Sequence, residues 1–160
     1  MKNRLLLIVV LSGLIMQSGK AQNRVIWQIG KADNNSAEFA LAPGEYKRFL
    51  EKDFGWEDKF FLIGNSNVKE EWPYVIPGPA DQWGGTWSTS GWRSHTLNIL
   101  FGIEKLPRQG EWKLIVDIQD INTKESPTFK ISINDTSWKF ELPLGSGNHT
   151  LDESRLVKYF

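Results

Sequence analysis

Aromatic side chains gather in one irregular stretch of the sequence. Residues 64–91 are rich in Gly, Pro, Asn and Ser and follow neither a helical nor a strand period, and five aromatic residues lie between positions 72 and 92. An indole ring can stack on the apolar C–H face of a pyranose while nearby polar side chains bind its hydroxyl groups. The stretch is therefore a candidate saccharide-binding loop. The residues that we expect to contact the sugar are Trp83, Trp87, Trp92, Arg93 and Asp81, with Trp72 and Tyr74 second.

Two other interpretations of this loop stay open. Its aromatic rings could fold back and form a small satellite core under the loop. The loop could instead dock onto a protein partner, because Trp, Tyr and Arg are common interface anchors. If the saccharide interpretation holds, Gln82 and Asn98 are near enough in sequence to bind hydroxyl groups.

Catalytic patterns are scarce. Residues 64–68 lack the second glycine of a nucleophile elbow, and the sequence has no glycine-rich phosphate loop and no histidine pair on a helix. His95 and His149 have no sequence partner for catalysis, so we expect structural or surface roles for them. The acid pairs Glu57-Asp58 and Glu70-Glu71 are more typical of solvated loop carboxylates than of a glycosidase pair. We therefore expect no enzyme activity from these residues.

Composition narrows the class of protein further. The 160 residues include 19 Lys and Arg, 19 Asp and Glu, and no Cys. The charge balance disfavours nucleic acid as a partner, and the lack of Cys excludes disulfides, thiolate metal sites and a cysteine nucleophile. No cofactor is expected. Asp, Asn and backbone carbonyls could supply an oxygen-ligated Ca²⁺ site, but no spacing identifies one.

Short strands must position the loop. Alternating apolar and polar residues predict strands near 24–29, 59–63, 96–103, 111–120, 129–133 and 138–142, with turn residues at 134–137. One or two helical turns over 45–51 would place Tyr46, Phe49 and Leu50 on one face. The absence of a βαβ rhythm favours an all-β fold, an antiparallel β-sandwich. We expect inward or core positions for Trp27, Trp112, Val116, Ile131, Trp138 and Phe140.

The two ends of the chain differ from the rest. A basic start precedes a nearly unbroken apolar run from Leu5 to Met16, and small residues follow up to Ala21. This pattern is typical of a secretory signal peptide, so we expect residues 1–21 to be removed and residues 22–160 to form one domain that is secreted or periplasmic and free of the membrane. Cleavage would remove three bases and no acid. An uncleaved anchor is the alternative. Residues 155–160 could be a final strand, or the domain could be cut before its last strands.

Several short motifs occur in an order that matches a known family. Trp27-Gln28-Ile29-Gly30, Asp33 and Glu38-Phe39 match a W-x-I-G, D, E-F opening. Phe61-Leu62-Ile63-Gly64-Asn65-Ser66 with Glu71-Trp72 matches an apolar-x-V-G-x-S-D…D-W segment, except that Asn67 replaces the Asp. Gly85-Thr86-Trp87 and Gly110-Glu111-Trp112-Lys113-Leu114 match G-T-W and G-x-Y-K-L-R. In this order they resemble the third domain of rhamnogalacturonan lyases of polysaccharide lyase family 4.

This resemblance implies a fold and a role. The family's third domain is a jelly-roll β-sandwich similar to galactose-binding-like carbohydrate-binding modules, whereas lyase chemistry belongs to a large N-terminal domain. Because the signal-like segment directly precedes the third-domain-like segment, no catalytic residue is carried over. We therefore expect an exported, non-catalytic module that binds a plant-type polysaccharide or oligosaccharide of the pectin or rhamnogalacturonan class. The alternative is the N-terminal fragment of a longer secreted polysaccharide lyase or glycoside hydrolase whose catalytic domain is encoded downstream.

Overall fold

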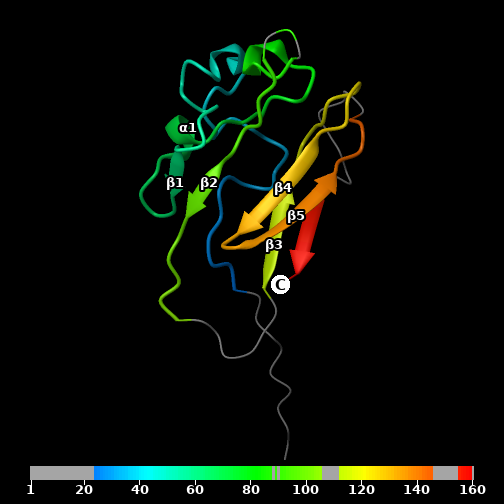
Figure 1. Ribbon diagram of the computed structural model, residues 1–160. Coiled ribbons are helices and arrows are strands. Elements are labelled where there is room, and N and C mark those ends of the chain that lie inside the picture. The colour runs from blue at the N-terminus through cyan, green and yellow to red at the C-terminus, as the bar shows by residue number, and fades with distance from the viewer. Residues whose placement is uncertain (1–23, 88, 90, 106–111, 146–154, 160) are drawn as a thin grey trace, which may run out of the picture.

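The computed structural model describes residues 24–87, 89, 91–105, 112–145 and 155–159. Within them, short helical segments alternate with three two-stranded sheets (Figure 1). The elements are η1 (Tyr46–Arg48), β1 (Phe60–Leu62), α1 (Val68–Glu71), η2 (Gln82–Gly84), β2 (Asn98–Leu100), β3 (Lys113–Asp117), β4 (Thr128–Ile133), β5 (Thr136–Glu141) and β6 (Arg155–Tyr159), where η marks a 3-10 helix. The described chain is thus β-rich with few helices, which agrees with the predicted class. The jelly-roll sandwich stays a prediction, because these sheets are small.

The deepest burial lies around η1, away from the predicted strands of the core. Phe49 and Phe54 are almost completely enclosed, their ring centroids are 5.7 Å apart, and Ala40 and Leu41 pack with them. The predicted apolar face is present, since Phe49 is buried and Tyr46 and Leu50 are half-buried. Helical structure is shorter than predicted, a single 3-10 turn over 46–48. This cluster anchors the irregular loops on either side of it.

The pairing of β1 with β2 corrects the expectation of a wholly antiparallel fold. The two strands are parallel, with Phe60 opposite Asn98 and Leu62 opposite Leu100. Their connection passes through α1 and η2, and parallel strands require a long crossover of this kind. The Asn98 side-chain amide donates to the backbone carbonyls of Glu57 and Lys59 and holds the start of β2 against the chain before β1. Apolar alternation indicates the faces of a strand, not the direction of its partner.

The C-terminal half contains the predicted hairpin. β4 and β5 are antiparallel across the two-residue turn Asn134-Asp135, and β3 pairs antiparallel with β6. Figure 1 shows the β4–β5 hairpin crossing the β3–β6 pair in this view. Side-chain exposure alternates along β3 and β4, as one packed and one solvated face require. The predicted inward residues all fall in the less exposed phase, although each is half-buried rather than enclosed: Trp112, Val116, Ile131, Trp138 and Phe140.

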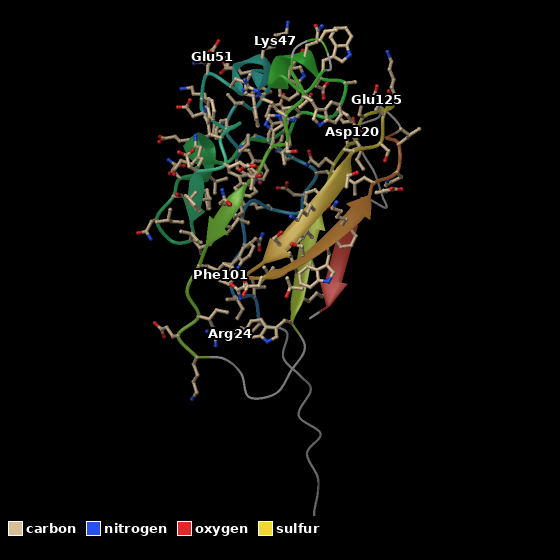
Figure 2. The ribbon with its side chains drawn as sticks, in the orientation of Figure 1. Arg24, Lys47, Glu51, Phe101, Asp120 and Glu125 are labelled. Carbon is tan, nitrogen blue, oxygen red and sulfur yellow. The ribbon has the colours of Figure 1, made fainter. Side chains whose placement is uncertain are left out.

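The N-terminal strand predicted over residues 24–29 is wrong. Residues 24–28 have no regular structure and no partner strand in the described part of the chain. Trp27 instead packs on Phe101, with ring centroids 5.3 Å apart, and is half-buried. Figure 2 shows Phe101 and Arg24 at the end of the molecule opposite η1, so this contact ties the N-terminal segment to the chain beyond β2. The alternation of apolar residues in this segment therefore reflects side-chain packing and not membership of a sheet.

The W-x-I-G and E-F motifs have a structural role. Gly30 adopts a positive φ of 71°, and a Cβ at this position would lie 2.1 Å from Cζ of Phe39. Only glycine accommodates both the backbone conformation and the ring. One carboxylate oxygen of Glu38 accepts a hydrogen bond from the Lys31 amide at 2.9 Å. The motif therefore closes a turn on the aromatic ring of Phe39.

The second motif caps α1. The Asn67 side chain accepts from the Lys69 amide at 3.0 Å, and Glu71 accepts from the Asn67 amide and the Ser66 hydroxyl, both at 2.7 Å. Two hydrogen bonds lower the pKa of Glu71 below its usual value: the bond from the Asn67 amide has the larger effect, and the bond from the Ser66 hydroxyl has the smaller. Asn caps a helix as well as Asp does, so the Asn67 departure from the family pattern leaves this role intact. Glu71 is thereby part of a cap, not of a catalytic acid pair.

Candidate functional site

The loop from Pro77 to Thr86 is held from inside by polar bonds. Thr86 is buried, and its hydroxyl lies 2.5 Å from the carbonyl oxygen of Gly78 and 2.7 Å from that of Asp81. The Asp81 carboxylate accepts from the Gly78 amide at 2.7 Å. Asp81 is therefore committed to folding the loop. These bonds satisfy a buried hydroxyl and make the loop a defined support for the residues that follow it.

Gly84, Gly85 and Thr86 determine the path of the backbone at the end of the loop. A Cβ on Gly84 would lie 2.1 Å from Cγ of Pro77, so the chain passes too close to Pro77 for a side chain here. Gly85 ends η2 in the left-handed conformation, with φ of 68°. Thr86 then points inward, and Trp87 is 42% exposed. In the sequence Gly85-Thr86-Trp87, the first two residues fold the loop and the third remains available at the surface.

Three of the predicted aromatic contacts are engaged in packing. Trp83 and Tyr74 pack against the core cluster, and Trp83 meets Tyr46 and Phe49 at centroid distances of 5.2 and 5.8 Å. Burial raises the pKa of Tyr74. The half-buried Trp72 meets Phe61 at 5.4 Å. For these rings the satellite-core interpretation describes the packing well, and none has a free face comparable to that of Trp87.

The remaining predicted residues are exposed and are joined by one that the sequence pattern does not single out. Trp92 is 65% exposed, Arg93 is also exposed, and Trp56 is 54% exposed. The Arg93 guanidinium carbon lies 5.8 Å from the centre of the Trp56 ring. Arg93 also runs along Gly85, where its Cδ would be 3.4 Å from an added Cβ. Trp87 follows Gly85 by two residues and Trp92 precedes Arg93, so we call Trp56, Trp87, Trp92 and Arg93 the exposed aromatic surface.

Trp56 enters this surface from a separate turn. The turn contains Asp53 with a positive φ of 58°, and Trp56 follows Gly55 just before β1. A shallow open hollow beside the ring is lined by Asp53, Trp56, Asp58 and Lys59. The ammonium of Lys59 is already engaged, since it donates to the Lys52 carbonyl at 2.6 Å and lies 4.0 Å from the centre of the Phe54 ring. The only sequence signal for this site is a lone Trp in a polar turn.

His95 lies behind the loop, between it and the core. Its ring meets Phe49 edge to face at 5.1 Å, and neither ring nitrogen has a hydrogen-bond partner among the described residues. Burial is the main cause of a pKa below the usual 6.5, and the charge of Arg93 adds to this effect. The nearby Gly84 backbone opposes the shift, although it forms no hydrogen bond of normal geometry with the ring. Burial therefore favours the neutral form of His95, which serves as a packing residue.

Acidification should destabilise the domain through His95. Because its pKa is lower in the folded state, the unfolded state takes up the proton first as the pH falls. The contribution of neutral His95 to stability is complete above about pH 6.5 and declines as the pH drops through 6.5 towards the folded-state pKa. Melting temperatures of the parent and of His95→Gln should be compared between pH 7.5 and 5.5. We expect the parent to lose more stability than the variant, and equal losses would contradict the account.

Exposed indole rings are the main feature of the described loops. No group of three His, Asp or Glu side chains among them is arranged to hold a metal ion. None of the helices in this part of the chain has the length and apolar character needed to cross a membrane. What the geometry does provide is three exposed indole rings and one guanidinium, on loops braced against a buried core.

Residues 25–154 match the family model described as CBM-like, polysaccharide lyase family 4, domain III. The chain belongs to this family. No curated protein and no solved structure gives a significant match. The motifs of polysaccharide lyase family 4 domain III can now be divided by role in this chain. Those at Trp27–Phe39 and Phe61–Trp72 fold the domain, whereas Gly85-Thr86-Trp87 ends on an exposed ring.

Proposed function

We propose that this chain is a carbohydrate-binding accessory module of the jelly-roll type, which holds a polysaccharide on the exposed aromatic surface. The observation that carries the proposal is the exposure of Trp87 and Trp92, at 42% and 65%, on a braced loop of a CBM-like domain. Large apolar rings exposed together on a soluble surface commonly mark a ligand or partner site. Flat indole faces match the C–H face of a pyranose.

The support beneath the rings favours binding by a preformed surface. The buried Thr86 hydroxyl, the Asp81 carboxylate and the packed Trp83 ring fix the loop through contacts within the chain. Fixing a loop before binding reduces the entropy that binding would otherwise cost. Trp83 and Asp81, predicted as sugar contacts, thus support the site from below in this proposal. Tyr74 packs against the core cluster and Trp72 packs on Phe61, and the proposal keeps both as second-rank sugar contacts.

Catalysis belongs to a separate domain in this proposal. The module would keep a pectic polysaccharide close to the active site of a lyase or glycoside hydrolase, and the described residues would make no bond-breaking contribution. Mixing the purified domain with rhamnogalacturonan should therefore give retention of the polysaccharide without release of unsaturated uronate products. Product release by the isolated domain would contradict the non-catalytic role.

Retention on polysaccharides tests the proposal directly. The purified protein should be passed through gels containing rhamnogalacturonan, polygalacturonan, cellulose or no polysaccharide, and its mobility compared with that of a non-binding protein. We expect retardation in a pectic gel. Unchanged mobility in every gel, together with no signal on a glycan array, would overturn carbohydrate binding and favour docking of the aromatic surface onto a protein partner.

Export is part of the proposed role. We propose that residues 1–21 are removed during secretion and that the mature chain begins at Gln22, because a basic start, an apolar run and small residues precede that position. N-terminal sequencing of protein collected outside the cytoplasm should start at or within a few residues of Gln22. Recovery of intact Met1 in a membrane fraction would instead show an uncleaved anchor.

A further inference from the structure

Arg93 differs from Arg48, an arginine at the same end of the fold, in the groups that contact its guanidinium. Arg48, beside η1, lies 3.0 Å from Glu45 and 3.3 Å from Glu51, so two carboxylates compensate its charge. Arg93 lies over the ring of Trp56 instead, and no ion pair joins it to an acid among the described residues. A planar guanidinium that rests on an aromatic face keeps its N–H donors free at its rim.

Both Trp56 and Gly85 lie next to the Arg93 side chain. The Trp56 ring lies 5.8 Å from its central carbon, and Gly85 leaves room for the Arg93 side chain, whose Cδ and Nε would lie 3.4 and 3.5 Å from an added Cβ. Trp92, the neighbour in sequence, is 65% exposed. A free cation beside exposed indole rings is suited to a ligand that combines an apolar face with an anionic group.

We propose that Trp56 is a positioning residue for Arg93, and that this pair makes the surface selective for saccharides that carry a carboxylate. The inference rests on the proposed carbohydrate binding and adds to it the role of the Trp56–Arg93 pair in preferring the free acid over its ester. The guanidinium binds the carboxylate of a uronic acid residue through two parallel N–H···O bonds, a geometry that a lysine ammonium does not reproduce.

The acidic residues near Trp56 determine how a bound saccharide is oriented in this proposal. Asp53 and Asp58 line the hollow on the Trp56 side and would repel a carboxylate, but they accept hydrogen bonds from hydroxyl groups. The carboxylate of the saccharide therefore lies at the Arg93 guanidinium. Its neutral, hydroxyl-bearing part extends towards the hollow.

A charge-matched pair of ligands tests this selectivity. Binding of a galacturonate oligosaccharide and of its fully methyl-esterified form should be measured by calorimetry on the parent, on Arg93→Gln and Arg93→Lys, and on Trp56→Ala and Trp56→Phe. Arg48→Gln is the control, because it removes an arginine whose charge is already paired. Melting temperatures show that each variant is folded.

The parent should prefer the free acid about fivefold, the upper range for one solvent-exposed ion pair. Arg93→Gln and Trp56→Ala should reduce the ratio to about one, whereas Trp56→Phe and Arg48→Gln should retain it, and Arg93→Lys should fall between. Equal binding of the two ligands by the parent, or an unchanged ratio in Arg93→Gln, would overturn this inference alone. Binding of neither ligand would overturn the proposed carbohydrate binding as well.

Discussion

Truncation of Phe49 to alanine should lower the free energy of unfolding by about 3–5 kcal/mol, comparable to the whole stability of a marginal domain. Phe49 is completely buried, and its ring contacts Phe54, Trp83 and His95 at centroid distances of 5.7, 5.8 and 5.1 Å. Removing it leaves a cavity between η1 and the loop that carries Trp87. We expect little soluble protein, or a large drop in the denaturant concentration at the unfolding midpoint. Tryptophan fluorescence monitors this unfolding.

The matched control for this prediction is another phenylalanine of the same half. Phe60, the first residue of β1, is 45% exposed, so Phe60→Ala should cost less than about 1 kcal/mol. If Phe49→Ala unfolded at the same denaturant concentration as the parent, the cluster around η1 would not be the core of the domain.

Removal of an exposed ring should have the opposite signature: normal folding with weak binding. Trp92→Ala and Trp87→Ala take away rings that are 65% and 42% exposed, so the melting temperatures should stay near that of the parent. If each ring stacks on a sugar, its loss should cost about 1–3 kcal/mol, or about 5- to 150-fold in affinity. Calorimetry against a retained pectic oligosaccharide measures this change.

Two controls separate stacking from packing. Ile115→Ala removes an equally exposed apolar side chain, at 45%, from β3 and should leave affinity unchanged. Trp83→Ala should instead lower stability, because its ring packs on Tyr46 and Phe49. Figure 1 shows η1 and η2 side by side, as those ring contacts require. Trp92→Ala and Trp87→Ala variants that both unfold would make this loop a satellite core.

Local sequence patterns were sufficient to predict most of the strands in the C-terminal half. The alternation around Trp112 and Phe140 predicts the strand phase, since period-two burial depends on neighbouring residues. Turn chemistry at 134–137 predicts the hairpin, although the turn itself is only Asn134-Asp135 and β5 begins at Thr136. Helical spacing predicts that Phe49 shares an apolar face with Tyr46 and Leu50, but it does not predict that Phe49 is the most deeply buried of the three. Family membership was also predictable, because the order of short motifs survives in the sequence.

The features that sequence patterns could not predict depend on contacts between residues that are distant in the sequence. The parallel pairing of β1 and β2 depends on the path of the chain between them, and the segment around Trp27 found an aromatic contact instead of a partner strand. Trp83 and Trp87 have similar surroundings in sequence, yet only Trp83 reaches Phe49. Trp56 joins Arg93 from a distant turn, and no local spacing encodes that meeting.

The most direct test of the proposed function is one calorimetric titration of the parent and of the double variant Trp87→Ala/Trp92→Ala with the same rhamnogalacturonan oligosaccharide. Both proteins should first be shown to melt at similar temperatures. The account predicts binding by the parent and at least about 30-fold weaker binding by the double variant, equivalent to about 2 kcal/mol. Equal dissociation constants for the two folded proteins would contradict it and would place any sugar site elsewhere on the domain.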